Sequence, residues 1–165
     1  IGLECLVGDA RGHGEVVLLA QDEAGYAALC RHNSKALLEV EGGNDPVIPL
    51  DGLLAAGQGL VLLPGGGVNG FVGAAGAEGQ TALVTERLAT LQAGMPGRVY
   101  IELQRHGLAS EQRAEPILLD AALATGLSGH STHPWHSTHP WHPAHAGHAG
   151  HAAHSSIPPM PGMLP

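Results

Sequence analysis

The abrupt end of the charged residues is the feature that most limits what this chain can fold into. All 15 Asp and Glu and all 7 Lys and Arg of its 165 residues lie at or before Asp120. From Ser128 to Pro165 the chain consists mostly of His, Pro, Ser, Thr, Ala and Gly, with both tryptophans. A segment with so little apolar surface to bury stays unfolded, because nothing offsets the entropy lost on ordering it. We therefore expect a folded domain over 1–127 and a low-complexity tail over 128–165, either disordered or out of frame.

Histidine recurs at every third residue of this tail. The run is His130, His133, His136, His139, His142, His145, His148, His151 and His154. A period of three fits neither a helix nor a strand, but it fits polyproline II. Neutral imidazoles bind Zn²⁺, Ni²⁺ or Cu²⁺, and we expect adventitious metal binding at His130, His133, His136, His139 and His142. A His-rich metal-binding protein is one function that this composition leaves open.

Short apolar runs alternate with amphipathic segments in the first 127 residues. The pattern predicts strands at 15–20, 60–63 and 98–103, beside an apolar opening segment at 1–7. It predicts helices at 23–39, 53–56, 77–93 and 110–125. Asp22 and Ser110 are the predicted N-caps, and Gly126 is the predicted C-terminal glycine. This order is typical of α/β proteins with three or four βα units and a parallel sheet, which periodicity alone cannot assign to an open sheet or a barrel.

Polar residues near strand ends are the candidate site. Glu102 and His106 flank the end of the strand at 98–103, where ligands bind in parallel α/β proteins. Glu4 is a carboxylate among apolar neighbours, typical of a strand end or a site. The Gly-rich loop at 64–70 follows a strand but lacks the ending of a phosphate-binding loop, and the segment at 74–77 after it is interpreted as a flexible connector.

Charge and hydropathy exclude two classes of partner. The net charge is -8, which opposes a free-standing nucleic-acid-binding surface. No apolar run approaches the roughly 18 residues of a membrane-spanning helix, and no signal segment opens the chain. We expect a cytoplasmic protein. Because the chain begins inside an apolar segment, we also expect it to be a piece of a longer protein.

Four segments of the first 127 residues together carry a family resemblance. They are Ile-Gly-Leu-Glu at 1–4, Val-Leu-Leu-Ala-Gln-Asp-Glu-Ala-Gly-Tyr at 17–26, Leu-Leu-Pro-Gly-Gly at 62–66 and Pro-Gly-Arg-Val-Tyr-Ile-Glu-Leu-Gln-Arg-His-Gly at 96–107. These segments resemble the N-terminal region of bacterial DNA polymerase III alpha subunits, their polymerase and histidinol phosphatase (PHP) domain. The resemblance extends to Leu127 and covers about three quarters of the chain. It implies part of a distorted βα barrel.

The resemblance also implies a function and a metal site. Glu4 matches a metal ligand of active PHP domains, which hold Zn, Mn or Mg, whereas Glu15 stands about where active members often have a ligand histidine. The family's His-x-His segment and its later Asn-Asp-x-His segment have no counterpart here, so we expect no bound cofactor. The implied role is structural, within a protein that carries out DNA synthesis in DNA replication as a nucleotidyltransferase. The implied partners are the rest of the alpha subunit and other replisome subunits.

Two alternatives remain open at this point. One is a stand-alone metal-dependent phosphoesterase of the PHP superfamily, and the other is the His-rich metal-binding protein. The resemblance stops between Leu127 and Ser128, where the charged residues also disappear, and a change of reading frame is our preferred explanation for both.

Overall fold

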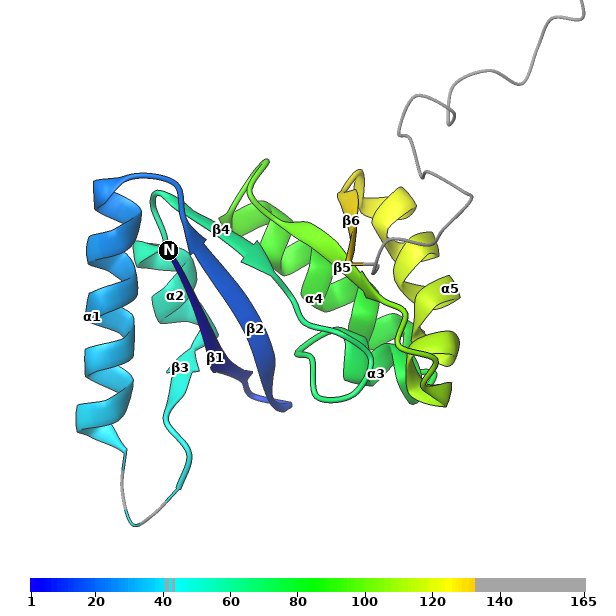
Figure 1. Ribbon diagram of the computed structural model, residues 1–165, viewed down its shortest axis with the longest axis horizontal. Coiled ribbons are helices and arrows are strands. Elements are labelled where there is room, and N and C mark those ends of the chain that lie inside the picture. The colour runs from blue at the N-terminus through cyan, green and yellow to red at the C-terminus, as the bar shows by residue number, and fades with distance from the viewer. Residues whose placement is uncertain (41, 43, 133–165) are drawn as a thin grey trace, which may run out of the picture.

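A computed structural model describes residues 1–40, 42 and 44–132 of the chain (Figure 1). The order of its elements is that of a mixed α/β fold, with an antiparallel pair of strands at the start. The strands are β1 (Gly2–Asp9), β2 (Gly12–Ala20), β3 (Val47–Pro49), β4 (Leu60–Leu63), β5 (Tyr100–Gln104) and β6 (Ser128–Thr132). The helices are α1 (Glu23–Glu39), α2 (Leu50–Ala56), α3 (Gly73–Ala77), α4 (Thr81–Gly94) and α5 (Ala109–Thr125).

The sheet is mixed, so the expectation of an all-parallel sheet is wrong. Strands β3, β1, β2 and β4 lie in that order, and β2 runs antiparallel to both of its neighbours. The parallel pair β5–β6 continues from β4 through a bridge between Leu62 and Val99. Two apolar runs so close in sequence join through the tight turn after Asp9, which is too short for the helical crossover that a parallel pair needs.

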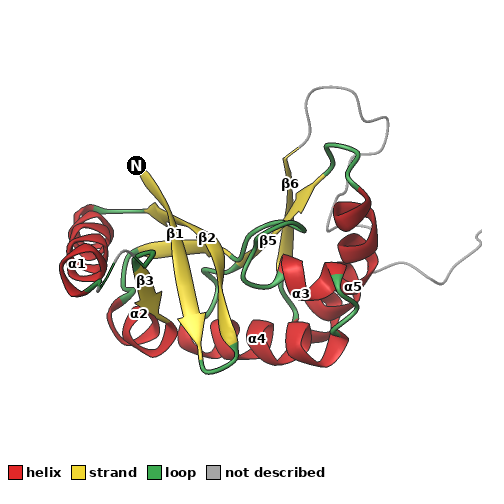
Figure 2. Cartoon of the chain, turned by 90° about the horizontal axis from the view of Figure 1, so that it is seen from below, coloured by secondary structure: helices red, strands yellow, loops and turns green. Residues whose placement is uncertain are grey.

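The described helices cover one face of the sheet, and none of them covers the other. Figure 2 shows α2, α3 and α4 below the strands and no helix above them. In β2, Val16 and Leu18 point to the helices and are fully buried, whereas Leu19 is 38% exposed on the opposite face. The core therefore lies between the sheet and its helices. We call the uncovered side of the sheet the open face.

Two elements match their predicted bounds. Helix α1 begins after Asp22, whose Oδ1 accepts a hydrogen bond of 2.8 Å from the N–H of Gly25. An N-cap of this kind satisfies a backbone donor that the helix itself leaves unpaired. The buried strand at 60–63 is confirmed as β4. Gly126 adopts the left-handed conformation, with φ of 69°, that closes α5.

The helical segments correct three predictions. The segment at 74–77 is not a connector, because it lies within α3, where Ala75 and Gly76 are buried. The helix predicted at 77–93 begins at Thr81 instead, after a turn at Gly79. Ser110 is not the cap of α5, because that helix starts at Ala109 with Leu108 as its N-cap. None of the described helices is long and apolar enough to cross a membrane.

Strand β6 lies inside the segment assigned to the tail. Its backbone pairs with β5 over five residues, and Glu102 stands opposite His130 in the register. The α/β alternation therefore continues past Leu127. The pairing uses backbone N–H and C=O groups, which each residue of Ser128–Thr132 offers. The tail residues from His133 onward, including His136, His139 and His142, lie outside the described residues.

Candidate functional site

A hollow of about 590 Å³ lies on the open face, over the β1–β2 hairpin. Glu4 on β1 pairs with Val17, and Glu15 on β2 pairs with Leu6. Paired residues lie on the same face of a sheet, as do residues two positions apart on one strand, so Glu4 and Glu15 share this face. His13 comes from the same hairpin, and Asp45 comes from the loop before β3. The hairpin thus brings together two carboxylates that are eleven positions apart in sequence. The hollow is lined by Glu4, Cys5, Leu6, His13, Gly14, Glu15, Asp45, Val68, Asn69 and Ala74.

The Gly-rich loop at 64–70 forms one wall of this hollow. The N–H of Glu15 donates to the carbonyl of Asn69 at 2.8 Å, and the Asn69 Nδ2 donates to the Glu15 Oε1 at 3.4 Å. The glycines allow the loop to coil tightly, since a Cβ on Gly65 would lie 2.5 Å from the Cα of Gly70. Close backbone packing thus accounts for the glycines, and only the tip of the loop, at Val68 and Asn69, is exposed.

Arg87 on α4 contacts Phe71, the residue directly after this loop. Its guanidinium donates to both oxygens of Asp9, with Nε–Oδ2 at 2.9 Å and Nη2–Oδ1 at 3.0 Å. Its Nη1 donates to the carbonyl of Phe71, and its Cζ lies 3.9 Å from the centroid of the Phe71 ring. Only 8% of Arg87 is exposed. This buried arginine therefore joins α4 to the end of β1 and to Phe71.

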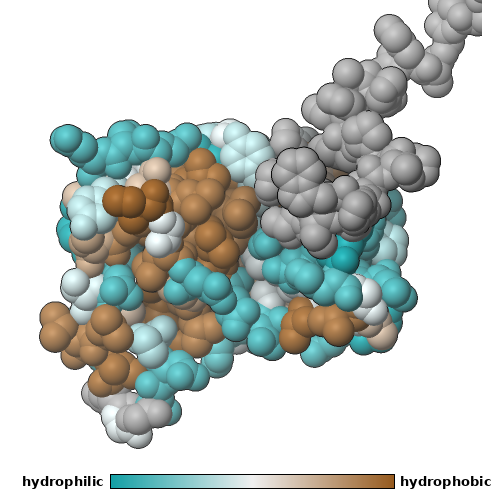
Figure 3. All heavy atoms as spheres, in the orientation of Figure 1, coloured by the Kyte–Doolittle hydropathy of each residue, from teal (hydrophilic) through white to brown (hydrophobic). Residues whose placement is uncertain are grey.

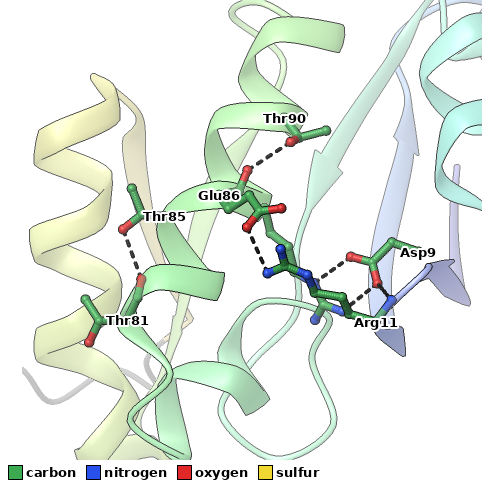
Figure 4. A network of polar contacts seen from close by, with 7 residues as sticks. Asp9, Arg11, Thr81, Thr85, Glu86 and Thr90 are labelled. Atoms are coloured by element: carbon green, nitrogen blue, oxygen red, sulfur yellow. Dashed lines mark hydrogen bonds and ion pairs between the residues drawn. The ribbon is translucent and has the colours of Figure 1, made fainter.

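A second, exposed arginine strengthens the turn after β1. Figure 4 shows Arg11 reaching Glu86 on α4, with a distance of 2.8 Å between Nη1 and Oε2. The N–H of Arg11 also donates to Asp9 at 2.8 Å. Desolvation raises the pKa of Asp9, but hydrogen bonds from Arg87 and from the Arg11 backbone outweigh it and hold that pKa below its ordinary value. Asp9 is thus a structural carboxylate, and sequence reasoning missed it.

The donors around the hollow do not fit the metal cluster that the resemblance implies. Glu4 is exposed and has no hydrogen-bond or ion-pair partner among the described residues. Burial and the nearby Glu4 carboxylate raise the pKa of Cys5 to about 11, so this residue stays a thiol at neutral pH and is a poor ligand. Within the described ranges, no group of three or more His, Cys, Asp or Glu residues stands close enough to hold a metal ion.

Glu102 and His106, the predicted polar pair, have different partners. Glu102 is 8% exposed and accepts a hydrogen bond of 3.0 Å from Gln104. His106 lies 2.7 Å from Glu111 through its Nδ1, and its backbone N–H donates to the same carboxylate at 2.8 Å. No hydrogen bond or ion pair joins Glu102 to His106 in the described part of the chain.

The Glu111 carboxylate caps the N-terminus of helix α5. It also accepts from the N–H of Leu108 at 3.1 Å, and it therefore satisfies two backbone donors ahead of the helix. Glu111 at the third helical position is a known capping signal, which the sequence analysis overlooked in favour of Ser110. Desolvation raises the pKa of Glu111, but the hydrogen bonds from His106 and Leu108 outweigh it and lower that pKa.

Replacing Glu111 with glutamine should lower the free energy of unfolding by about 1 kcal/mol at neutral pH, the usual value of a helix cap. The lowered pKa means that the charged carboxylate stabilises the fold. That stabilisation is complete above the ordinary pKa of 4.5 and is lost as the pH falls below it. Urea unfolding should therefore show a difference between the two proteins that is full at pH 7 and shrinks as the pH falls below 4.5.

Asp120→Asn is the matched control on the same helix. Asp120 is exposed and has no partner among the described residues, so its substitution should change stability by less than about 0.5 kcal/mol. A difference between wild type and Glu111→Gln that stays constant with pH would contradict the prediction.

Comparisons with a family model and with known proteins all point to the same family. The model of the family described as PHP domain matches residues 1–106. The chain is 40% identical over 107 residues to the DNA polymerase III subunit alpha of Caulobacter vibrioides (strain NA1000 / CB15N), covering 65% of this chain and 9% of that protein. It is 35% identical over 122 residues to the subunit of the same description from Escherichia coli (strain K12), covering 74% and 10%. It is 33% identical over 108 residues to the DNA polymerase III subunit alpha of Vibrio cholerae (serotype O1, strain ATCC 39315 / El Tor Inaba N16961), covering 66% of this chain and 9% of that protein.

Proposed function

The chain belongs to the PHP domain family, and from this premise we propose that it forms part of the PHP domain of a replicative DNA polymerase alpha subunit, with a structural role. The observation that carries the proposal is the similarity to three such subunits at 33–40% identity. The chain spans about a tenth of the length of these relatives. We therefore propose DNA synthesis for the longer protein only. For this chain we propose contacts with the rest of an alpha subunit and with other replisome proteins.

The chemistry of the described residues supports a structural role. Nucleotidyl transfer uses carboxylates that hold two metal ions about 4 Å apart. Among the described carboxylates, Glu4 is exposed, Asp9 is paired with Arg87, Glu111 caps α5, and the buried Glu102 accepts a hydrogen bond from Gln104. These contacts stabilise a scaffold.

The test is the nucleotide sequence on both sides of the codons for this chain, read in all three frames. We expect a long downstream frame that encodes a polymerase. A frame that encodes one domain with an upstream His-x-His segment would contradict the proposal and favour the phosphoesterase.

The phosphoesterase is the second candidate, because Glu4 and Glu15 lie in one hollow, although the described residues around them form no group of three metal ligands. Its test is hydrolysis of p-nitrophenyl phosphate with Mn²⁺, Zn²⁺ or Mg²⁺, in wild type and in the Glu4→Gln variant. The proposed structural role predicts no turnover that depends on Glu4. Turnover that the substitution abolishes would support the phosphoesterase.

We also propose that the PHP-like sequence ends at Leu127 and that the His-rich tail begins at Ser128. A change of reading frame there accounts for the loss of charged residues, and the same three-frame reading tests it. Binding of Ni²⁺ or Zn²⁺ by the histidines from His130 onward is the property that we propose for the tail as it stands, because imidazole suits both metals.

A further inference from the structure

A second hollow, of about 700 Å³, lies between helix α1 and the segment formed by β3 and α2, and we call it the α1 hollow. Figure 3 shows apolar residues gathered over the strands at the centre of the molecule, whereas this hollow lies beside β3, the edge strand of its sheet. Its apolar wall includes Ala36 of α1, Ile48 of β3 and Ala56 of α2. Sites for small molecules have volumes of about 300 to 1,000 Å³, so the α1 hollow is large enough for one.

Two cations on the wall of the α1 hollow have little to bind within the chain. Arg31 and Lys35 stand one turn apart on α1, and both line the hollow. Arg31 has no hydrogen-bond or ion-pair partner among the described residues, and the Lys35 Nζ reaches only the Glu39 Oε1, at 4.0 Å. Like charges one turn apart destabilise a helix, and a bound anion would offset that repulsion. Each of the other arginines is engaged elsewhere, in the pairs Arg11–Glu86, Arg87–Asp9, Arg98–Gly57, Arg105–Glu115 and Arg113–Ala77.

His32 lies beside these two cations without adding to their charge. Burial lowers the pKa of His32, a hydrogen bond with the backbone of Ala56 opposes this, and the charges of Arg31 and Lys35 lower the pKa further. At neutral pH, Arg31 and Lys35 are therefore the only cations among the described residues that line the hollow. The His32 Nε2 is also buried without a hydrogen-bond partner in the described part of the chain. Because buried polar atoms normally have a partner, the chain leaves the polar contacts of this region incomplete.

The carboxylates of the α1 hollow limit the charge of its ligand. Glu39 is the last residue of α1, and Asp45 lies in the loop that connects α1 to β3, so both are displaced from Arg31 toward the end of the helix. At a rise of about 1.5 Å per residue, Arg31 and Glu39 are about 12 Å apart along α1. Asp51 accepts a hydrogen bond of 2.8 Å from the N–H of Gly52. A ligand with a single charge near Arg31 avoids these carboxylates, whereas a phosphate monoester, with nearly two charges, is repelled more strongly.

We propose that the α1 hollow binds a small apolar carboxylic acid, whose carboxylate lies between Arg31 and Lys35 and whose apolar body lies against Ile48 and Ala56. The planar guanidinium of Arg31 can donate two parallel hydrogen bonds to a carboxylate. The apolar body adds affinity, because its burial removes apolar surface from water. This site does not depend on the structural role proposed above.

The experiment titrates the isotope-labelled full chain with octanoate or octan-1-ol and follows the backbone amide shifts by NMR, at pH 7.5 and about 0.15 M NaCl. Octanoate should shift amides of α1 and α2 and bind at least about tenfold more tightly than octanol, the usual contribution of hydrogen bonds to a charged group. Octanedioate carries a second carboxylate at its far end, which meets Glu39 and Asp45. It should therefore bind at least about tenfold more weakly than octanoate.

The double variant Arg31→Gln/Lys35→Gln tests the two cations. Both residues are exposed, and without their charges octanoate and octanol should bind equally within about twofold. The matched control is Arg11→Gln/Arg113→Gln, which removes the same net charge from two exposed arginines outside the hollow and should keep the tenfold preference. Circular dichroism and urea unfolding verify that each variant is folded.

The variant Gly52→Leu tests the apolar part of the site. Gly52 lines the α1 hollow, and a Cβ there would meet nothing within 4 Å, so leucine fits without a clash. Leucine also favours the helix more than glycine does. Because its side chain takes space that the ligand needs, octanoate and octanol should both bind at least about tenfold more weakly.

Four outcomes would overturn the proposal. They are the absence of octanoate-induced shifts in α1 and α2, equal binding of octanoate and octanol to wild type, an equal loss of preference in the Arg11/Arg113 control, and tighter binding of octyl phosphate or octanedioate than of octanoate. Shifts confined to β1 and β2 would place the ligand on the open face and would also contradict it. None of these results bears on the polymerase reading frame, so a failure here is separable from a failure of the proposed function.

Discussion

Replacing Arg87 with methionine should lower the free energy of unfolding by about 3 kcal/mol, the largest effect that we expect from a single substitution in this chain. Methionine fills a similar volume but leaves the Asp9 carboxylate without its two hydrogen bonds from the guanidinium. It also leaves the carbonyl of Phe71 without its donor and removes the cation from the Phe71 ring. Urea unfolding at pH 7 measures the change.

Arg11→Met provides the control for Arg87→Met, because both arginines pair with a carboxylate in the same region. The Arg11–Glu86 pair has side chains that are 53% and 56% exposed, and exposed pairs contribute less than about 1 kcal/mol. Equal losses for the two substitutions would show that burial does not distinguish them, contrary to our argument. Salt should weaken only the Arg11 contribution, since buried pairs are poorly screened.

Replacing Gly25 with alanine should lower the free energy of unfolding by about 2 to 3 kcal/mol, as overpacking of a tight core does. A Cβ on Gly25 would lie 2.0 Å from the carbonyl oxygen of Gly59 and 2.7 Å from its carbonyl carbon. These are backbone atoms that hold the N–H of Gln21 through a 2.9 Å hydrogen bond, so they cannot move aside at low cost. The first turn of α1 would have to separate from the turn before β4.

Gly52→Ala is the matched control, and the sign of its effect should be opposite. Gly52 also lies within a helix, α2, but a Cβ there would meet nothing within 4 Å. Alanine should stabilise by about 0.5 to 1 kcal/mol, because it restricts the unfolded chain without a clash. A stabilising effect of Gly25→Ala in the same urea experiment would contradict the close approach of α1 and Gly59.

Local signals in the sequence predict local structure well. Asp22 predicts the start of α1 because an N-cap and its helix are adjacent in the chain. The short apolar run at 60–63 likewise predicts β4. The segment at 74–77 fails because small residues such as Ala75 and Gly76 carry little periodic signal, yet they allow α3 to pack closely against α5. Helix formation there depends on tertiary packing rather than on propensity.

The candidate site was less predictable, because its contacts are distant in sequence. Glu4 was identified, but its proximity to Glu15 depends on the antiparallel register of β1 and β2. A parallel sheet was expected, and this register could not follow from it. Asp9 and Arg87 are 78 positions apart, and no pattern links two residues at such a separation. Glu102 and His106 were predicted together because they flank one strand end, but the His106 Nδ1 lies beside the helix-capping Glu111.

The contact between Arg87 and Asp9 also has a consequence for the order of folding. The β1–β2 hairpin closes through a turn between Asp9 and Gly12, and hairpins of this kind form in about 1 to 10 μs. The ion pair at its end must wait for α4, because a contact across 78 positions closes a long loop of chain. Stopped-flow kinetics of Arg87→Met should therefore show faster unfolding with little change in the folding rate, as expected for a contact that forms after the rate-limiting step.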